Sequence, residues 1–269
     1  MPCSHRKEKL LFTALPVRLL TIANTLYQNA NLTAIILSLT DLRNQTKDSL
    51  PHWLHEKERI QLATYTFAKR HREWLGGRIC AKQGLRIFLR QKKNSSFIPS
   101  HHRVRVATEK SGRPYFNPLK GIDFPLPELS ISHSKEYAAT LTSHFHCGID
   151  IQYPTDNLLT VTEHFATAHE ENLLNDSLAH HHQLSRLAML WAAKEASKKM
   201  FSPNGMPGFH DIILKKIIKK DAQNSVFTFL KNDPFQQTFP VTIGMLDNGY
   251  SLAFCCHSPN IQQGNNTHA

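Results

Sequence analysis

Trp191-Ala192-Ala193-Lys194-Glu195-Ala196-Ser197-Lys198-Lys199 lies within a run from Leu184 to Met200 that has a helical pattern. Apolar residues recur with the i, i+3, i+4, i+7 spacing of a core-facing stripe, at Leu184, Leu187, Ala188 and Trp191. Steps of four residues extend this stripe to Glu195 and then to Lys199. A buried carboxylate is costly unless a partner neutralises it. Either these two side chains pair with each other, or the helix directs a carboxylate and an ammonium at a site.

A second candidate element is the strand predicted at residues 147–152, in which apolar and polar residues alternate. The alternation places Asp150 and Gln152 on one face of the strand and the two isoleucines on the other. Mg²⁺ takes few protein oxygens and completes its octahedron with water and ligand phosphates. Asp150, Gln152 and Glu195 can supply such oxygens. The alternative is that Asp150 and Glu195 are unrelated surface acids.

The predicted helix at residues 67–90 is strongly basic and contains Gly76-Gly77. A glycine pair weakens a helix unless a backbone or a ligand approaches closely. The cations of this helix, together with Arg113 in a later turn, can hold phosphates. The alternative is that they form a solvated face, which is the usual role of a charge run. The cations of the helix are Lys69, Arg70, Arg72, Arg78, Lys82, Arg86 and Arg90. His133 lies near the end of a predicted strand. The alternative to a role in the site is that it is a structural histidine.

Composition limits the classes of partner. The chain has 269 residues, 41% of them hydrophobic, and a net charge of +11, which indicates an anionic partner. Nucleic acid, a membrane surface, a phosphate-rich ligand and an acidic protein all fit that charge. A nucleic-acid-binding protein is the main alternative function, but the basic residues are not interleaved with stacking aromatics and no recognisable binding module is present.

The cysteine pattern and the hydropathy indicate a reduced, non-membrane environment. The five cysteines are odd in number and form no C-x-x-C motif, so neither a disulfide framework nor a zinc knuckle is predicted. No apolar run reaches the roughly 20 residues needed to span a bilayer. Residues 7–17 faintly resemble a secretory signal, but Pro16 and Arg18 interrupt the apolar run. We expect a cytoplasmic protein that binds no membrane.

Hydrophobic periodicity predicts an α+β chain with two similar halves. We expect an N-terminal extension at residues 1–30, one half at 31–145 and a second at 146–269. Tyrosine-led strands, Tyr137–Ser143 and Tyr250–Cys256, end the two halves and give a faint internal repeat. Helices are predicted at 67–90, at 160–182 with a loop near residue 175, and at 184–200; strands are predicted at 34–39, 129–134, 137–141, 147–152, 211–218, 226–230, 241–245 and 250–255.

Four segments, in order, resemble the large pseudodimeric class of 4′-phosphopantetheinyl transferases, the type that activates surfactin synthetase. Gly112-Arg113-Pro114 is similar to the family's Gly-Lys-Pro turn, and Ser130-Ile131-Ser132-His133-Ser134 is similar to its "NISHS" segment with serine for asparagine. Gly148-Ile149-Asp150-Ile151-Gln152 resembles "GIDIE", and Trp191 to Lys199 matches "W-x-x-K-E-[AS]-x-x-K". The resemblance covers about residues 33–256.

The resemblance implies a pseudodimer of two α+β halves with the active site in the cleft between them. Such an enzyme transfers the phosphopantetheine arm of coenzyme A, its co-substrate, to a serine of an apo-acyl or peptidyl carrier protein and releases 3′,5′-ADP. It requires Mg²⁺. Because carriers are typically acidic and coenzyme A is polyanionic, the basic surface would attract both. Two fused halves already provide the interface between them, so the resemblance implies a monomer. It also implies a protein that binds no nucleic acid.

The resemblance also implies roles for individual residues. Asp150, Gln152 and Glu195 would be the metal ligands, although Gln152 replaces the family's glutamate and is a weaker ligand. Lys199 would assist the leaving group. The general base for the serine would be Glu195 or a carboxylate of the preceding helix, where Glu170 and Glu171 both fit. The nucleotide phosphates would be bound by Lys69, Arg72, Arg113 and His133.

Overall fold

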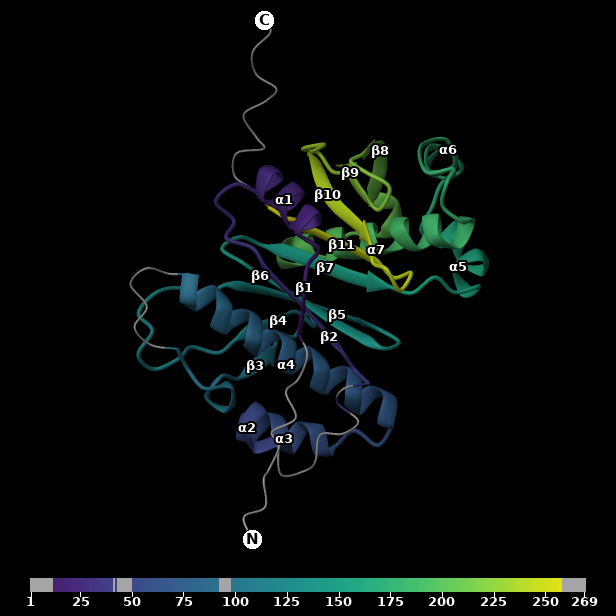
Figure 1. Cartoon of the computed structure of the whole chain (residues 1–269). Coiled ribbons are helices and arrows are strands. Elements are labelled where there is room, and N and C mark those ends of the chain that lie inside the picture. The colour runs from purple at the N-terminus through teal and green to yellow at the C-terminus, as the bar shows by residue number, and fades with distance from the viewer. Residues whose placement is uncertain (1–11, 41, 43–49, 92–97, 258–269) are drawn as a thin grey trace, which may run out of the picture.

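The computed structural model describes residues 12–40, 42, 50–91 and 98–257, and these form a mixed α+β structure with antiparallel sheets (Figure 1). The helices are α1 (Val17–Leu26), α2 (Leu50–Trp53), α3 (Glu56–Ala63), α4 (Ala68–Gln91), α5 (Asn157–Thr160), α6 (Ala168–Ser177) and α7 (Gln183–Phe201). The strands are β1 (Phe12–Ala14), β2 (Thr33–Ser38), β3 (Val106–Thr108), β4 (Pro114–Phe116), β5 (Glu128–Ser134), β6 (Tyr137–Ser143), β7 (Cys147–Gln152), β8 (Ile212–Lys219), β9 (Asn224–Lys231), β10 (Thr238–Met245) and β11 (Ser251–Cys256).

The first sheet has the strand order β1-β2-β6-β5, and α4 packs against β2 and β6 (Figure 1). The glycine pair in α4 permits this close packing. A Cβ atom at Gly76 would overlap the Leu39 side chain, and one at Gly77 would come too close to Ile131. The close approach that the glycines predict is therefore made by side chains of β5 and of the residue that follows β2.

The second sheet has the order β7-β11-β10-β9-β8, and α7 packs against β7 and β11. Gly148 of β7 is the point of closest approach, because a Cβ atom there would overlap the backbone carbonyl of Ala196. Any larger residue at this position would push α7 away from the strand that carries Asp150. The glycine thus fixes the distance between the two elements of the candidate site.

A ladder of serine hydroxyls joins the two sheets. Ser130 Oγ accepts from Ile149 N at 3.1 Å, Ser132 Oγ from Ile151 N at 3.2 Å, and Ser134 Oγ from Tyr153 N at 3.1 Å. Alternate residues of a strand share one face, so the serines at every second position of β5 meet the amides at every second position along β7. The hydroxyls satisfy backbone donors along β7 and align β5 with it residue by residue.

The same order of elements occurs in both parts of the chain. In the first part β2 precedes α4 and the β5–β6 hairpin, and β2 pairs with β6. In the second part β7 precedes α7 and the β10–β11 hairpin, and β7 pairs with β11. Both helices pack on the first and last strands of their set.

Each part also contains a buried lysine–glutamate pair built in the same way. Lys194 Nζ lies 2.7 Å from Glu170 Oε1 and donates to the Phe209 carbonyl, and both charged side chains are fully buried. Lys82 pairs with Glu58 and donates to the Trp53 carbonyl. Each glutamate is the third residue of a helix and closes a capping box, in α6 and in α3.

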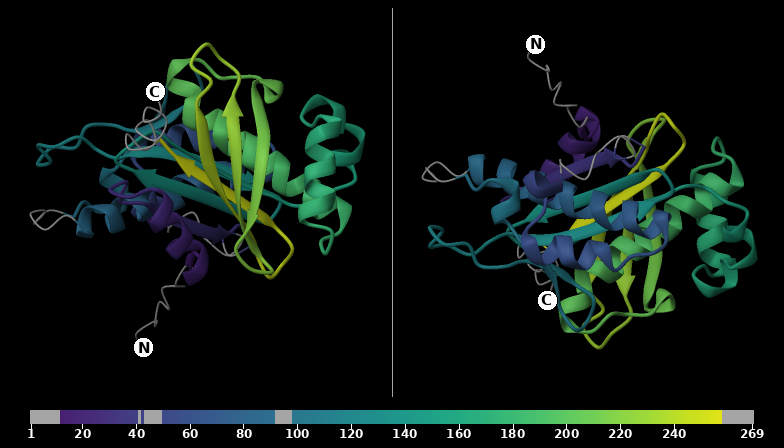
Figure 2. Two further views of the ribbon diagram at one scale, coloured as in Figure 1. Left: turned by 90° about the horizontal axis from the view of Figure 1, so that it is seen from above. Right: turned by 90° about the horizontal axis from the view of Figure 1, so that it is seen from below.

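The N-terminal residues pack against the second sheet. Helix α1 lies over the C-terminal strands and contacts β10 (Figure 2). Tyr27, which is 2% exposed, donates its hydroxyl to the Pro240 carbonyl at 2.9 Å. The sequence pattern did not predict β1 or α1, since α1 has no capping side chain and a mixed composition. The boundary of the extension at residue 30 stays a prediction.

The largest secondary-structure error lies at residues 160–182. The loop predicted near residue 175 is wrong, because α6 runs through that position and the irregular segments lie on either side of α6. Thr167 starts this helix by a capping box with Glu170, so the capping signal outweighs the asparagine. Across the described parts of the chain, no helix combines the length and apolarity that a membrane span requires.

His101 makes the fold sensitive to acid. Its ring lies 4.4 Å from that of Trp53, and burial, aided by nearby cations, lowers the pKa of His101 to about 4. This group therefore stabilises the fold fully above its unfolded pKa of about 6.5, and the contribution is lost as pH falls toward 4.

We expect His101→Phe to reduce the loss of unfolding free energy between pH 7 and pH 5 by about 1–2 kcal/mol. Urea titrations at the two pH values measure this difference, with the exposed His169→Phe as control. An unchanged difference between the two pH values would contradict the assignment.

Candidate active site

Asp150 is the centre of the candidate site. It lies on β7, is 6% exposed, and its Oδ1 accepts from Ser132 Oγ at 2.6 Å and from Lys199 Nζ at 2.7 Å. Lys199 also donates to the Ile149 carbonyl at 2.9 Å. The structure therefore brings together a strand carboxylate and the last turn of α7.

Glu195 lies one helical turn before Lys199 and belongs to the same environment. Its charge acts on Asp150, and its Oε1 accepts from Lys198 Nζ at 3.0 Å. Burial raises the pKa of Asp150, and Glu195 adds to that effect, whereas Lys199 and Ser132 oppose it. Asp150 and Glu195 are neighbouring carboxylates whose negative charges repel each other, and a cation would stabilise this arrangement.

The buried face of α7 differs from the predicted stripe. Trp191 is only partly buried, packing against Phe165 and Phe209 at ring distances of 5.1 Å and 4.9 Å. Lys194, one position before Glu195, is the charged residue that is completely buried. The line from Trp191 through Glu195 to Lys199 is thus the half-exposed edge of α7. Glu195 and Lys199 do not pair with each other.

Gln152 lies at the end of the same strand, where its Nε2 donates to the Tyr153 carbonyl at 2.8 Å. Among the described residues, no cluster of three or more His, Cys, Asp and Glu side chains is arranged to hold a metal ion. Asp150 and Glu195 are two such groups, and the Gln152 amide would be a third oxygen donor. This all-oxygen set fits Mg²⁺ with a coordination shell completed by water or phosphate.

His133 connects the site to α4. The His133 Nε2 lies 3.4 Å from Arg70 Nη1, and its Nδ1 lies 3.7 Å from Glu73 Oε2. Burial lowers the pKa of His133; Glu73 opposes this effect, while Arg70, Lys199 and Lys69 add to it. The charges around His133 therefore come from α4 and from α7. The Lys69 charge acts on His133, whereas the Arg72 charge acts on its neighbour His71.

Helix α4 also carries Arg78, one of the cations predicted to hold phosphates, and Glu73, which no sequence pattern indicated. Arg78 is 7% exposed and donates to Thr108 Oγ1 at 3.2 Å, and its Nε has no hydrogen-bond partner within the described residues. Glu73 is the one carboxylate of α4. The available signal for Glu73 was that it is a single acid in a basic helix.

Arg113 lies at the other end of β5 from His133. It pairs with Glu128, the first residue of that strand, and its Nη2 lies 3.1 Å from His146 Nδ1. The five residue steps from Glu128 to His133 along the strand span roughly 17 Å. A cavity of about 340 Å³ adjoins Arg113 and is lined by aromatic and apolar side chains that include Tyr115 and Phe124.

Glu170 forms a buried ion pair with Lys194. Its Oε1 accepts from Leu214 N at 2.8 Å, and its Oε2 accepts from Thr167 N at 2.9 Å and from Lys194 Nζ at 2.9 Å. Both oxygens therefore have protein donors, and the side chain has no exposed surface. Glu171, the other carboxylate considered as a base, is half-buried on the same helix.

Comparison with known proteins identifies the C-terminal part of the chain. Residues 146–255 match the family model of the 4′-phosphopantetheinyl transferase superfamily. The matched region runs from the start of β7 to the end of β11 and contains Asp150, Glu195 and Lys199. A search of curated protein sequences gives no match.

Two similar solved structures are holo-acyl-carrier-protein synthases. That from Plasmodium yoelii is 13% identical with a TM-score of 0.36, covering 44% of this chain and 94% of its own. That from Thermotoga maritima is 17% identical with a TM-score of 0.32, covering 50% of this chain and 74% of its own. Residues 146–255 are thus similar to the 4′-phosphopantetheinyl transferase superfamily, in agreement with the family that the sequence motifs resemble.

Proposed function

We propose that the chain transfers the 4′-phosphopantetheine arm of coenzyme A to a serine hydroxyl of an apo-acyl or peptidyl carrier protein. The observation that carries the proposal is the meeting of Asp150, Glu195 and Lys199 at the contact between β7 and α7, inside the region that matches the superfamily. In the reaction the serine oxygen forms a bond to the β-phosphorus of coenzyme A. The bond to the bridging oxygen breaks, and 3′,5′-ADP leaves.

Asp150 and Glu195 would hold Mg²⁺, with the Gln152 oxygen beside them. When bound, the ion supplies electrostatic stabilisation of charge on the transferring phosphate. Asp150 is oriented for this role by Ser132, which donates to its Oδ1 at 2.6 Å. Lys199 contacts the same oxygen and would interact with the pyrophosphate and stabilise the departing 3′,5′-ADP.

Glu195 is the carboxylate that we assign as general base. A base must lie within hydrogen-bond reach of the serine proton, and Glu195 is partly exposed next to Asp150. Glu170 is fully enclosed by Lys194, Thr167 and Leu214, which suits a structural role. The serine proton would therefore pass to Glu195.

The nucleotide of coenzyme A would bind along α4 and β5. Lys69, with Arg70 and the buried Arg78, would supply cations from one side of the site, and the His133 ring would supply a hydrogen-bonding group beside them. The cavity beside Arg113 would receive a further part of the nucleotide, since Arg113 combines a cation with apolar walls there. Arg72 would act as a helper from the same helix.

The chain would be a pseudodimer that functions as a monomer. The repeated order of strand, helix and hairpin supports two related halves, as do the two buried lysine–glutamate pairs. Lys82 follows Glu58 by the same number of residues as Lys194 follows Glu170. The cleft between the halves would then hold the site, because His133 comes from the first half and Lys199 from the second.

The test of this function is the release of 3′,5′-ADP from coenzyme A in the presence of Mg²⁺ and an apo-carrier. We expect one equivalent of 3′,5′-ADP for each carrier modified, measured by chromatography. A carrier with its serine replaced by alanine should give none. Release that is independent of the carrier serine would contradict a transferase and indicate hydrolysis.

Gln152 predicts an unusual dependence on Mg²⁺. A neutral amide binds a hard cation more weakly than a carboxylate does. We expect Gln152→Glu to reach half-maximal activity at a lower Mg²⁺ concentration than the unchanged protein, measured by titrating Mg²⁺ at saturating coenzyme A.

The control for this titration is Gln236→Glu, which adds the same charge at an exposed position in the loop between β9 and β10. Equal Mg²⁺ requirements for Gln152→Glu and the unchanged protein would show that residue 152 is not a ligand.

A further inference from the structure

Lys198 places a second positive charge at the end of α7, next to Lys199 and close to Glu195. Its Nζ lies 3.0 Å from Glu195 Oε1 and also lies over the Phe209 ring, 3.8 Å from the ring centroid. The Lys198 side chain is only 15% exposed, so the ion pair is largely enclosed. The motif from Trp191 to Lys199 leaves position 198 open, so the lysine there is a feature of this chain.

Phe209 fixes the place of the Lys198 ammonium. The backbone carbonyl of Phe209 accepts from the fully buried Lys194 Nζ at 3.2 Å, and its ring packs against Trp191 at a ring distance of 4.9 Å. An aromatic face attracts a cation, and does so more strongly where water is partly excluded. The ring therefore keeps the ammonium of Lys198 next to Glu195 and away from solvent.

Each carboxylate of the candidate metal site thus has a lysine of its own. Lys199 contacts Asp150 Oδ1 at 2.7 Å, as Lys198 contacts Glu195. Two negative charges are matched by two positive charges, and the amide of Gln152 adds none. The charge of the ligands is one of the quantities that set the affinity of an oxygen site for a divalent cation. In this arrangement the protein offers such an ion little net attraction.

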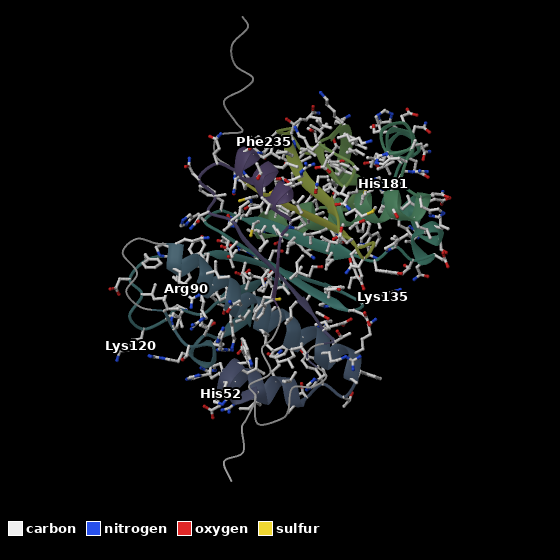
Figure 3. All side chains as sticks on the ribbon, viewed as in Figure 1. His52, Arg90, Lys120, Lys135, His181 and Phe235 are labelled. Atoms are coloured by element: carbon white, nitrogen blue, oxygen red, sulfur yellow. The ribbon has the colours of Figure 1, made fainter. Side chains whose placement is uncertain are left out.

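Lys135 does not change this count. It lies in the turn between β5 and β6 (Figure 3), and its ammonium lies 3.8 Å from the centroid of the Tyr153 ring. Within the described residues, Lys198 and Lys199 are the lysines that form ion pairs with the two site carboxylates.

We infer that Lys198 is a competing cation that occupies Glu195 in place of Mg²⁺ and keeps the affinity of the protein for free Mg²⁺ low. This inference rests on the proposed function, in which Glu195 is a metal ligand. Like charges repel, so an ammonium 3.0 Å from a ligand oxygen disfavours a divalent ion at that carboxylate. The pyrophosphate of coenzyme A supplies the negative charge that the site lacks, so metal and coenzyme A would each strengthen the binding of the other.

Lys198→Met tests the inference, because it removes the ammonium and keeps an unbranched side chain against the Phe209 ring. The probe is Mn²⁺, which takes the same oxygen ligands as Mg²⁺ and whose free fraction is measured by electron paramagnetic resonance. Without coenzyme A, we expect the variant to bind Mn²⁺ about tenfold more tightly than the unchanged protein. Lys198→Gln, which also removes the charge, should show the same gain, and Lys198→Arg, which keeps it, should show none.

Lys231→Met is the matched control. Lys231 also combines a carboxylate with an aromatic partner, Asp233 at 2.8 Å and the Phe201 ring at 4.7 Å. Its replacement removes one positive charge from the protein without freeing a site carboxylate, so Mn²⁺ binding should stay unchanged. In a Glu195→Gln background, Lys198→Met should have a much smaller effect on Mn²⁺ binding.

Two results would overturn the inference. One is equal or weaker Mn²⁺ binding by Lys198→Met, which would mean that Lys198 orients Glu195 and does not compete for it. The other is a gain that persists fully in the Glu195→Gln background. A failure of the proposed metal site would be seen separately, because Asp150→Asn and the unchanged protein would then bind Mn²⁺ equally well in the presence of coenzyme A.

Discussion

Asp150→Asn is expected to reduce phosphopantetheine transfer by at least about 10²-fold while the protein stays folded. The asparagine keeps the size of the side chain and can still accept from Ser132, but it removes the charge that pairs with Lys199 and would bind Mg²⁺. Lys199 is about one quarter exposed and can remain hydrated without its partner. The loss should therefore appear in catalysis much more than in stability.

The measurement is the initial rate of carrier modification at saturating coenzyme A, with far-ultraviolet circular dichroism and a melting curve on the same samples. Asp247→Asn, an exposed acid in the turn between β10 and β11, is the matched control and should keep full activity. If Asp150→Asn were as active as this control, the proposed metal site would be wrong. Glu195→Gln should also lose activity, because it removes both a ligand and the assigned base.

Lys194→Met is expected to destabilise the protein by about 3–5 kcal/mol. It removes one partner of a pair in which both side chains are completely buried, so Glu170 is left as an uncompensated charge. Burial lowers the pKa of Lys194, and Glu170 opposes that shift, which shows how closely the two groups depend on each other. Urea unfolding would measure the change, with the exposed Lys215→Met on β8 as control.

A second variant of the same pair tests whether the role of Glu170 is structural or catalytic. Glu170→Gln should lower stability, because Lys194 then has no countercharge, but the folded fraction should retain most of its activity. A loss of activity in fully folded Glu170→Gln comparable to that of Glu195→Gln would instead make Glu170 the base. A change of less than 1 kcal/mol in Lys194→Met would contradict the structural role.

Local sequence patterns predicted the elements of the site well. The alternation at β7 placed Asp150 and Gln152 correctly on a strand, and the period of α7 placed Glu195 and Lys199 one turn apart. Gly148 and the serines of β5 have a physical reason that the sequence alone did not reveal. The glycine lets α7 approach β7, and the serine hydroxyls bind the β7 amides.

Long-range partners were the part that the sequence could not supply. Helical periodicity indicated that Trp191 would be the buried residue, yet Lys194 is more deeply buried because Glu170, from a different helix, neutralises it. The basic segment of α4 similarly did not reveal that Glu73 faces His133, since that contact depends on how α4 packs on the first sheet. Residues far apart in the chain decide these environments.

The intact mass of a carrier protein tests the central proposal most directly. Apo-acyl and apo-peptidyl carriers would be incubated with the protein, coenzyme A and Mg²⁺ and then weighed by mass spectrometry. We predict a gain of one phosphopantetheine on the carrier serine, and no gain when Asp150→Asn replaces the unchanged protein. No gain on carriers from fatty acid, polyketide and nonribosomal peptide systems alike would contradict the proposed transferase function.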